Sequence, residues 1–158
     1  MGSLRLLRFL SVVLTALAFV PAGAHLFELP NKIGLPRDAY FVAQGLYRGW
    51  ALFGFVLFGA LSADSALAFA LWRSRRAAAA RLALAAASLV ALSLAVFFAW
   101  TQPANLATEN WTRAPADWEA LRSRWEYSHA ANAGLLFLAL CSVVLSVLDV
   151  GESGSDQA

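Results

Sequence analysis

Four long apolar stretches almost without charge set the strongest limit on how this chain can fold. They run over residues 6–27, 47–71, 82–100 and 130–150. The hydrocarbon core of a bilayer is about 30 Å thick and is crossed by about 20 helical residues, so each stretch is long enough. Because lipid cannot satisfy backbone polar groups, each stretch is expected to be a helix. The sequence therefore predicts an all-α fold, a four-transmembrane-helix bundle.

Composition supports a membrane domain. Of the 158 residues, 60 % are hydrophobic and 14 % are charged, whereas soluble domains carry nearer a quarter of charged residues. The length fits one domain, which we place at residues 1–150, followed by a small polar tail at 151–158 that we expect to be disordered. The net charge of +2 is too small to indicate a nucleic-acid-binding protein. The expected partners are the lipid bilayer and a lipophilic small molecule, and the oligomeric state stays open.

The arginines indicate an orientation. Arg5 and Arg8 precede the first stretch, and a short loop without acidic residues carries four arginines between positions 73 and 81. Because cytoplasmic loops are enriched in Lys and Arg, both termini are expected in the cytoplasm of a multi-pass protein of a bacterial inner membrane. The outer side also carries six basic residues, so the short basic loop decides. Alternatively, the first stretch is a signal peptide cleaved at Ala22-Gly23-Ala24.

Polar residues gather at one set of helix ends. With the expected orientation, all eight lie on the non-cytoplasmic side: His25, Glu28, Asn105, Glu109, Arg122, Glu126, His129 and Asn132. Polar groups at membrane depth are costly and usually functional. We therefore expect the functional site at this side of the membrane. Asp64, the one acid deep within a stretch, should instead bond to Ser62, Ser65, Ser88 or Ser93.

The segment before the fourth stretch predicts a helical extension with a distinct face. Pro115 suits the first turn of a helix that runs on into the fourth span. Trp118, Arg122, Trp125, His129 and Asn132 follow at spacings of three and four residues, which places them on one face. This face should point into the bundle or a water-filled vestibule. We expect Trp118, Trp125, Trp111 and Asn132 to bind substrate in an aromatic-walled pocket, although an interfacial aromatic belt is the alternative for the tryptophans.

The same cluster contains candidate catalytic residues. His129 or His25 would act as a general base, because imidazole titrates near neutral pH. Arg122 would stabilise a developing anion, and Asn105 would orient the substrate. A substrate dissolved in the membrane would enter sideways from the outer leaflet.

A single transition metal is a second interpretation of these residues. The first stretch ends with His25-x-x-Glu28, and the fourth is preceded by Glu126-x-x-His129. Residues three apart share a helical face, so two helices would together offer two imidazoles and two carboxylates to a metal ion. Two alternatives stay open: a metal-free network, or structural pairing of His25 with Glu28 and of Arg122 with Glu126.

Several blocks of the chain resemble a known family. They are Ala24-His25-Leu26-Phe27-Glu28-Leu29-Pro30-Asn31-Lys32, then Tyr40 and Gln44-x-x-Tyr47, then Pro103-x-Asn105, and Trp118-Glu119-x-Leu121-Arg122-x-x-Trp125-Glu126-Tyr127-x-His129. Together they resemble the small four-helix membrane proteins of the anthrone-oxygenase-like family, whose bacterial members are mostly described as a domain of unknown function. The block from Trp118 to His129 is the most specific.

The resemblance implies a function and a residue set. Asn105, Trp125 and His129, with Arg122, match the recurring polar positions of the family. A few relatives oxidise anthrones to anthraquinones with molecular oxygen and without an obvious bound cofactor. The resemblance therefore predicts an oxygenase-like oxidoreductase acting on a lipophilic aromatic substrate. The alternative is a non-enzymatic membrane protein, either an accessory subunit or a small-molecule-binding protein.

Overall fold

The computed structural model describes residues 2–152 as a helical chain without strands in that range. In chain order the elements are α1 (Gly2–Lys32), α2 (Arg37–Gln44), η1 (Gly45–Tyr47), η2 (Trp50–Leu52), α3 (Phe53–Arg73), α4 (Ala77–Val96), η3 (Phe97–Thr101), α5 (Gln102–Ala107) and α6 (Trp118–Glu152). The η1 and η2 segments are 3₁₀ turns, and η3 is a π-helical segment that joins α4 to α5. Of the tail expected to be disordered, 153–158 lie outside the described residues, and the two residues before them continue α6.

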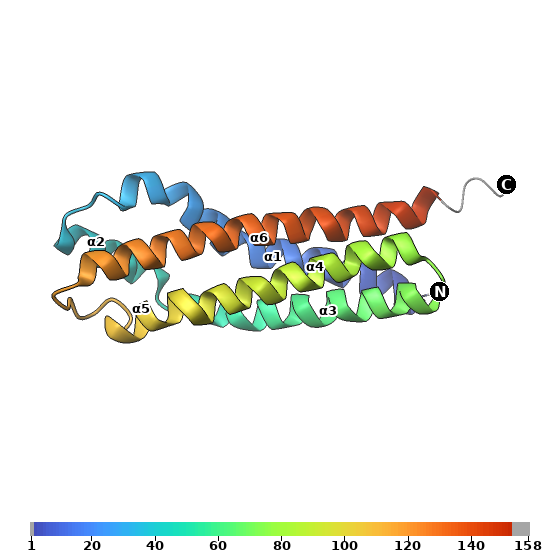
Figure 1. The fold of residues 1–158 in the computed structure, drawn as a ribbon, viewed down its shortest axis with the longest axis horizontal. Helices are drawn as coiled ribbons and strands as arrows, with labels where there is room; N and C mark the ends of the chain where they lie inside the picture. The colour runs from blue at the N-terminus through green and yellow to red at the C-terminus, as the bar shows by residue number, and fades with distance from the viewer. Residues whose placement is uncertain (1, 153–158) are drawn as a thin grey trace.

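Four long apolar helices run side by side as a bundle (Figure 1). The segments long and apolar enough to cross a membrane are Gly2–Lys32, Trp50–Arg73, Ala77–Ala107 and Trp118–Asp149. The predicted all-α, four-helix membrane bundle is confirmed. Most of these helices extend beyond the apolar stretches read from the sequence, because a helix continues into the interface after its apolar residues end.

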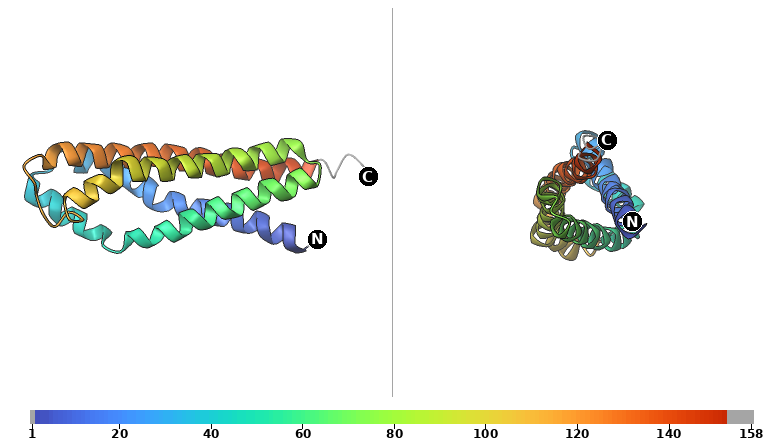
Figure 2. Two further views of the ribbon diagram at one scale, coloured as in Figure 1. Left: turned by 60° about the horizontal axis from the view of Figure 1, so that its bottom comes forward. Right: turned by 90° about the vertical axis from the view of Figure 1, so that its right-hand side faces the viewer.

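The two ends of the bundle differ in construction. Gly2, the end of α6 and the turn between α3 and α4 lie at one end, while α2 and α5 lie at the other (Figures 1 and 2). We call the end that holds α2, η1, η2, α5 and the start of α6 the site end. Because four helices cross in alternating directions, the two ends of the described chain face the same side of the membrane.

Small residues pack the half of the bundle away from the site end. Ala79, Ala80 and Ala83 of α4 are at most 2 % exposed and pack against Leu67 of α3 and Val143 of α6. In lipid, helices associate mainly through close van der Waals packing, which small side chains allow. This half of the molecule is therefore a closed helical core.

A buried hydrogen bond joins α1 to α3. The Thr15 hydroxyl donates to Asp64 Oδ2 over 3.0 Å, and both side chains are fully buried. The donor to this oxygen is therefore Thr15 and none of the four serines predicted from the sequence. Ser62 bonds to its own helix at the Phe58 carbonyl, and Ser93 donates to Asn132 on α6. Which residue of α1 faces Asp64 depends on how α1 and α3 are rotated about their axes. The local sequence around Asp64 does not determine this rotation.

Candidate functional site

A cavity of about 800 Å³ lies inside the site end. Its wall is built by α1, α2, the 3₁₀ turns, α3, the end of α4 with η3, α5 and α6. Six of the predicted site residues line it: His25, Asn105, Trp111, Trp125, His129 and Asn132. The volume lies within the range of about 300–1,000 Å³ that is usual for small-molecule sites. Residues from distant parts of the sequence thus meet around one space.

Two imidazoles and an indole form the polar aromatic part of the wall. The ring centroids of His25 and His129 are 4.2 Å apart, and the Trp125 ring lies 4.1 Å from His129 and 4.9 Å from His25. His25 is only 5 % exposed. Its Nδ1 has no hydrogen-bond partner among the described residues, and the nearest carboxylate oxygen, on Glu28, is 3.9 Å away. The expected meeting of the two histidines is therefore observed, with a ring nitrogen of His25 free of internal hydrogen bonds.

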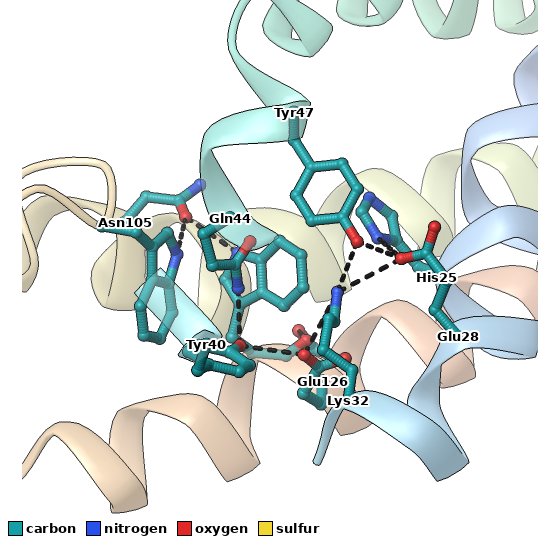
Figure 3. A network of polar contacts seen from close by, with 11 residues as sticks. His25, Glu28, Lys32, Tyr40, Gln44, Tyr47, Asn105 and Glu126 are labelled. Carbon is teal, nitrogen blue, oxygen red and sulfur yellow. Dashed lines mark hydrogen bonds and ion pairs between the residues drawn. The ribbon is translucent and has the colours of Figure 1, made fainter. Parts of the chain in front are cut away.

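Asn105 orients two of the tryptophans. Its Oδ1 accepts a hydrogen bond from Trp125 Nε1 over 2.8 Å and another from Trp111 Nε1 over 3.2 Å (Figure 3). A buried indole N–H needs such a partner. The side-chain oxygen of Asn105 therefore holds two indoles of the aromatic wall in place.

Asn132 lies one helical turn deeper than His129. The Ser93 hydroxyl donates to its Oδ1 over 3.1 Å. Asn132 also lines the cavity, so its amide group belongs to the cavity wall.

A charged network, the Lys32 cluster, adjoins the imidazoles (Figure 3). It consists of Glu28, Lys32, Tyr40, Gln44, Tyr47 and Glu126. Lys32 Nζ, at the end of α1, is 3.3 Å from Glu126 Oε1 and 3.4 Å from Glu28 Oε2, and it donates to the Tyr47 hydroxyl over 2.7 Å. The Tyr47 hydroxyl in turn donates to the Glu28 carboxylate. One buried ammonium therefore joins α1, η1 and α6.

Two tyrosine hydroxyls complete the Lys32 cluster as donors. Tyr40 donates to Glu126 Oε1 over 2.9 Å and accepts from Gln44 Nε2. Burial and the neighbouring Glu126 carboxylate raise the pKa of Tyr40 far above its ordinary value. Burial and the hydrogen bond to Glu28 raise the pKa of Tyr47 in the same direction. Both hydroxyls therefore keep their protons throughout the physiological range.

Arg122 and Trp118, a predicted catalytic and a predicted substrate-binding residue, lie outside the cavity wall. Arg122 donates to the Leu35 carbonyl over 2.8 Å, and its guanidinium lies 4.7 Å from the Trp118 ring and 5.5 Å from the Tyr40 ring. The cation–π contacts and the carbonyl bond hold α6 against the turn that precedes α2. The alternative pairing of Arg122 with Glu126 is not formed, because Glu126 contacts Lys32 and Tyr40 instead.

The arrangement does not favour a metal between the four predicted ligands. Lys32 Nζ approaches both Glu28 and Glu126 and already supplies the positive charge that a cation would bring. Neither glutamate lines the cavity with the histidines. Within residues 2–152, no group of three or more His, Cys, Asp or Glu side chains is arranged to hold a metal ion. A metal bound by His25, Glu28, Glu126 and His129 stays a prediction.

Several residues of the site end were not among the predicted site residues, and Gln44, Tyr47, Lys32 and Tyr40 are examples. Gln44 and Tyr47 line the cavity, and Lys32 connects the glutamates. Gln44 Oε1 is buried and has no hydrogen-bond partner among the described residues. The sequence offered one indication that these residues belong to the site: they lie in the blocks that carry the family resemblance.

The site thus combines a pair of imidazoles, two oriented indoles and the unsatisfied amide oxygen of Gln44 around one cavity at membrane depth. Its residues come from all four spans and from the short outer helices. The functional argument depends on this geometry, because no family model, no curated protein and no solved structure matches the chain.

Proposed function

We propose that this integral membrane protein is an oxygenase-like enzyme that oxidises a lipophilic aromatic substrate inside the cavity. The observation that carries the proposal is the contact between His25 and His129 on the cavity wall, with Trp125 beside both rings. A neutral imidazole is a suitable base for an acidic C–H or phenolic O–H, and the indoles offer flat apolar surfaces to a ring. The resemblance to the anthrone-oxygenase-like family supports the same chemistry.

The reaction we propose balances with molecular oxygen alone. His129 takes a proton from an activated ring CH₂ group, and the amide N–H of Asn132 stabilises the resulting enolate oxygen. The carbanion transfers electrons to O₂, a C–O bond forms at that carbon, and the imidazolium returns its proton to give a hydroperoxide. Loss of water from the hydroperoxide leaves a C=O group. In total, one CH₂ and one O₂ become one C=O and one H₂O.

A non-enzymatic binding protein is the second candidate. The observation that favours it is the Lys32 cluster, in which the ammonium and both carboxylates already have internal partners. Asn105 is likewise occupied by Trp111 and Trp125. Such a scaffold would hold a ligand without acting on it, so the protein would bind the same class of molecule without consuming oxygen.

Oxygen uptake separates the two candidates. The protein in lipid nanodiscs is given an anthrone, and oxygen consumption is followed together with anthraquinone absorbance. We expect the wild type to exceed empty nanodiscs and His129→Ala to lose about 100-fold in rate, the usual contribution of a general base. Tyr127→Phe, on the exposed side of α6, is the matched control and should keep full activity. Tight binding with no oxygen uptake by the wild type would overturn the enzyme proposal in favour of the binding protein.

Elemental analysis of the detergent-purified protein tests the metal version of this site. A stoichiometric transition metal that disappears in both His25→Ala and His129→Ala would support metal-assisted oxidation. Oxygen uptake by a preparation without metal would overturn metal-assisted oxidation. The imidazole acting as a general base would then explain the reaction.

A further inference from the structure

We infer that the ligand of this cavity is a tailed amphiphile: an aromatic head with hydrogen-bonding groups, carrying one prenyl or acyl chain that leaves the protein between α3 and α4. The inference rests on the proposed function in using the same cavity, and it names the class of substrate. It is carried by the distribution of side chains along the cavity and by the position of its lipid-facing mouth.

The cavity has two parts of different chemistry. The part toward the site end, the head chamber, carries the polar and aromatic groups His25, Gln44, Asn105, Trp111, Trp125 and His129. The part that reaches toward the middle of the bundle, the tail channel, is walled by Ala18, Ala22, Leu57, Leu94 and Leu136. The hydrogen-bonded pair Ser93 and Asn132 lies in the cavity wall next to Leu94. Such a division matches a molecule with a polar ring at one end and hydrocarbon at the other.

One mouth of the cavity faces lipid, while exposed lining residues such as Arg48, Asn110 and Thr112 mark another toward the outer loops. Phe58 of α3 and Phe98 of η3 line the cavity, yet they are 51 % and 57 % exposed. A side chain that belongs both to the cavity wall and to the lipid-facing surface marks the edge of an opening. Toward the site end the start of α3 and the end of α4 diverge (Figure 2). The opening therefore lies between these two helices.

Gly54 lies one helical turn before Phe58 on the same face of α3, and it therefore borders this opening. It lines the cavity on the first turn of α3, and a Cβ added there would meet no atom within 4 Å. Larger side chains at this position would project into free space without displacing the backbone. Gly54 is thus the position at which the tail channel can be narrowed without disturbing the head chamber.

The energetics favour a tailed ligand over a compact one. A hydrocarbon chain that passes from the bilayer into an apolar channel exchanges one apolar surrounding for another, so its transfer costs little. The head exchanges hydrocarbon for hydrogen bonds with groups such as Gln44 Oε1 and the Asn132 amide, which is favourable in a medium of low dielectric. A compact ring would leave the tail channel to be filled by lipid.

Binding of two quinone probes tests the inference. The probes share a dimethoxy-methyl-benzoquinone ring, and one carries a decyl chain. Quenching of tryptophan fluorescence in nanodiscs is measured at fixed lipid concentration for wild type, Gly54→Ala and Gly54→Leu. We expect Gly54→Leu to weaken binding of the decyl probe about tenfold, the usual size of an overpacking effect, and Gly54→Ala to lie between. Binding of the probe without a tail should change less than about twofold.

Gly134→Leu is the matched control. Gly134 is an exposed helical glycine of α6, also with no atom within 4 Å of an added Cβ, and it does not line the cavity. It should leave the binding of both probes unchanged. Equal weakening of both probes by Gly54→Leu, an unchanged affinity for the decyl probe, or no binding of the decyl probe to the wild type would overturn the inference. If the expected binding pattern appears but the anthrone assay shows no oxygen uptake, the proposed enzyme function is overturned and the inference about the tailed ligand stands.

Discussion

At the scale of single residues, Lys32 is the charge on which the site end depends. It is 5 % exposed, and its ammonium lies between the carboxylates of Glu28 and Glu126 and over the rings of Tyr47 and Trp125. Glu126 has no exposed surface, so its charge is compensated only by this neighbourhood. Removing one partner of a buried pair leaves an uncompensated charge, which costs more than the pair contributes when intact.

We therefore expect Lys32→Met to lower the free energy of unfolding by about 3–5 kcal/mol, measured by denaturant titration in detergent. The double variant Lys32→Met/Glu126→Gln should recover part of the loss, because the unpaired carboxylate is gone. Arg37→Met is the control: it breaks the exposed Arg37–Asp38 pair, which should contribute less than about 1 kcal/mol. Equal effects at Lys32 and Arg37 would contradict the assignment of Lys32 as the central cation.

Tyr40 gives the site end a dependence on alkaline pH. Because burial and Glu126 raise the pKa of Tyr40 in the folded protein, the folded state keeps a proton that the unfolded state loses above pH of about 10. Stability is therefore full below that pH and falls by about 1.4 kcal/mol per pH unit above it. Tyr40→Phe has no titrating hydroxyl at this position, so its stability lacks this dependence on pH. The difference in unfolding free energy between the wild type and Tyr40→Phe should therefore shrink as the pH rises from 9 to 11 (~2 units). A constant gap across thermal melts in this range would contradict the buried-donor role.

Residue spacing predicted part of the site and not all of it. His129 and Trp125 were found from their period on one helical face, and His25 from its position at a helix end. Arg122 and Trp118 share that face, yet they lie beyond the cavity along the helix axis. Periodicity determines the direction in which a residue points, but it contains no information on how far along the axis a cavity extends.

At the scale of elements, the contact between α1 and α3 depends on one hydrogen bond inside the membrane. Thr15→Val keeps the shape of the side chain and removes the donor to Asp64, whose Oδ1 already has no hydrogen-bond partner within residues 2–152. Leaving a buried carboxyl oxygen unpaired should cost about 1–3 kcal/mol, measured as a lower melting temperature in detergent. Ser62→Ala, on the exposed face of α3, removes only a bond to its own helix and should change stability by less than about 0.5 kcal/mol. Equal melting temperatures for the wild type and Thr15→Val would contradict this account.

The short outer elements were harder to predict than the spans. α2 has only eight residues, and η1 and η2 have three each. Isolated helices of this length are not stable in water, so their formation depends on tertiary packing. In α2 that packing comes from Tyr40, which is fully buried against Trp111 and bonded to Glu126. These partners are distant in the sequence, so no pattern within α2 predicts them.

At the scale of the whole molecule, the bundle predicts which loops share a side of the membrane. Ser74, in the α3–α4 turn, and Thr112, beyond α5, are exposed and lie at opposite ends. In a Cys141→Ser background, single cysteines replace each in turn, and intact cells are treated with a membrane-impermeant maleimide. Because basic loops are retained in the cytoplasm, we expect Thr112→Cys to be labelled directly and Ser74→Cys only after permeabilisation. The reverse pattern would place the termini outside, and equal labelling of both in intact cells would contradict a membrane-spanning bundle.

The four crossings follow from the sequence alone. Transfer of apolar residues into lipid adds up along a stretch, and the backbone of each stretch must be satisfied within its own helix. Both requirements are local, so composition and length are enough to predict them. Even the approximate place of the site follows, because polar residues at helix ends are visible in the sequence.

Only the tertiary structure decided what those polar residues do. His25 meets His129, Lys32 rather than Arg122 compensates Glu126, and Asn105 binds two indoles. Each of these pairs depends on the rotation and axial register of helices that are distant in the chain. Register is set by the packing of all four helices together, so no single segment of the sequence contains it.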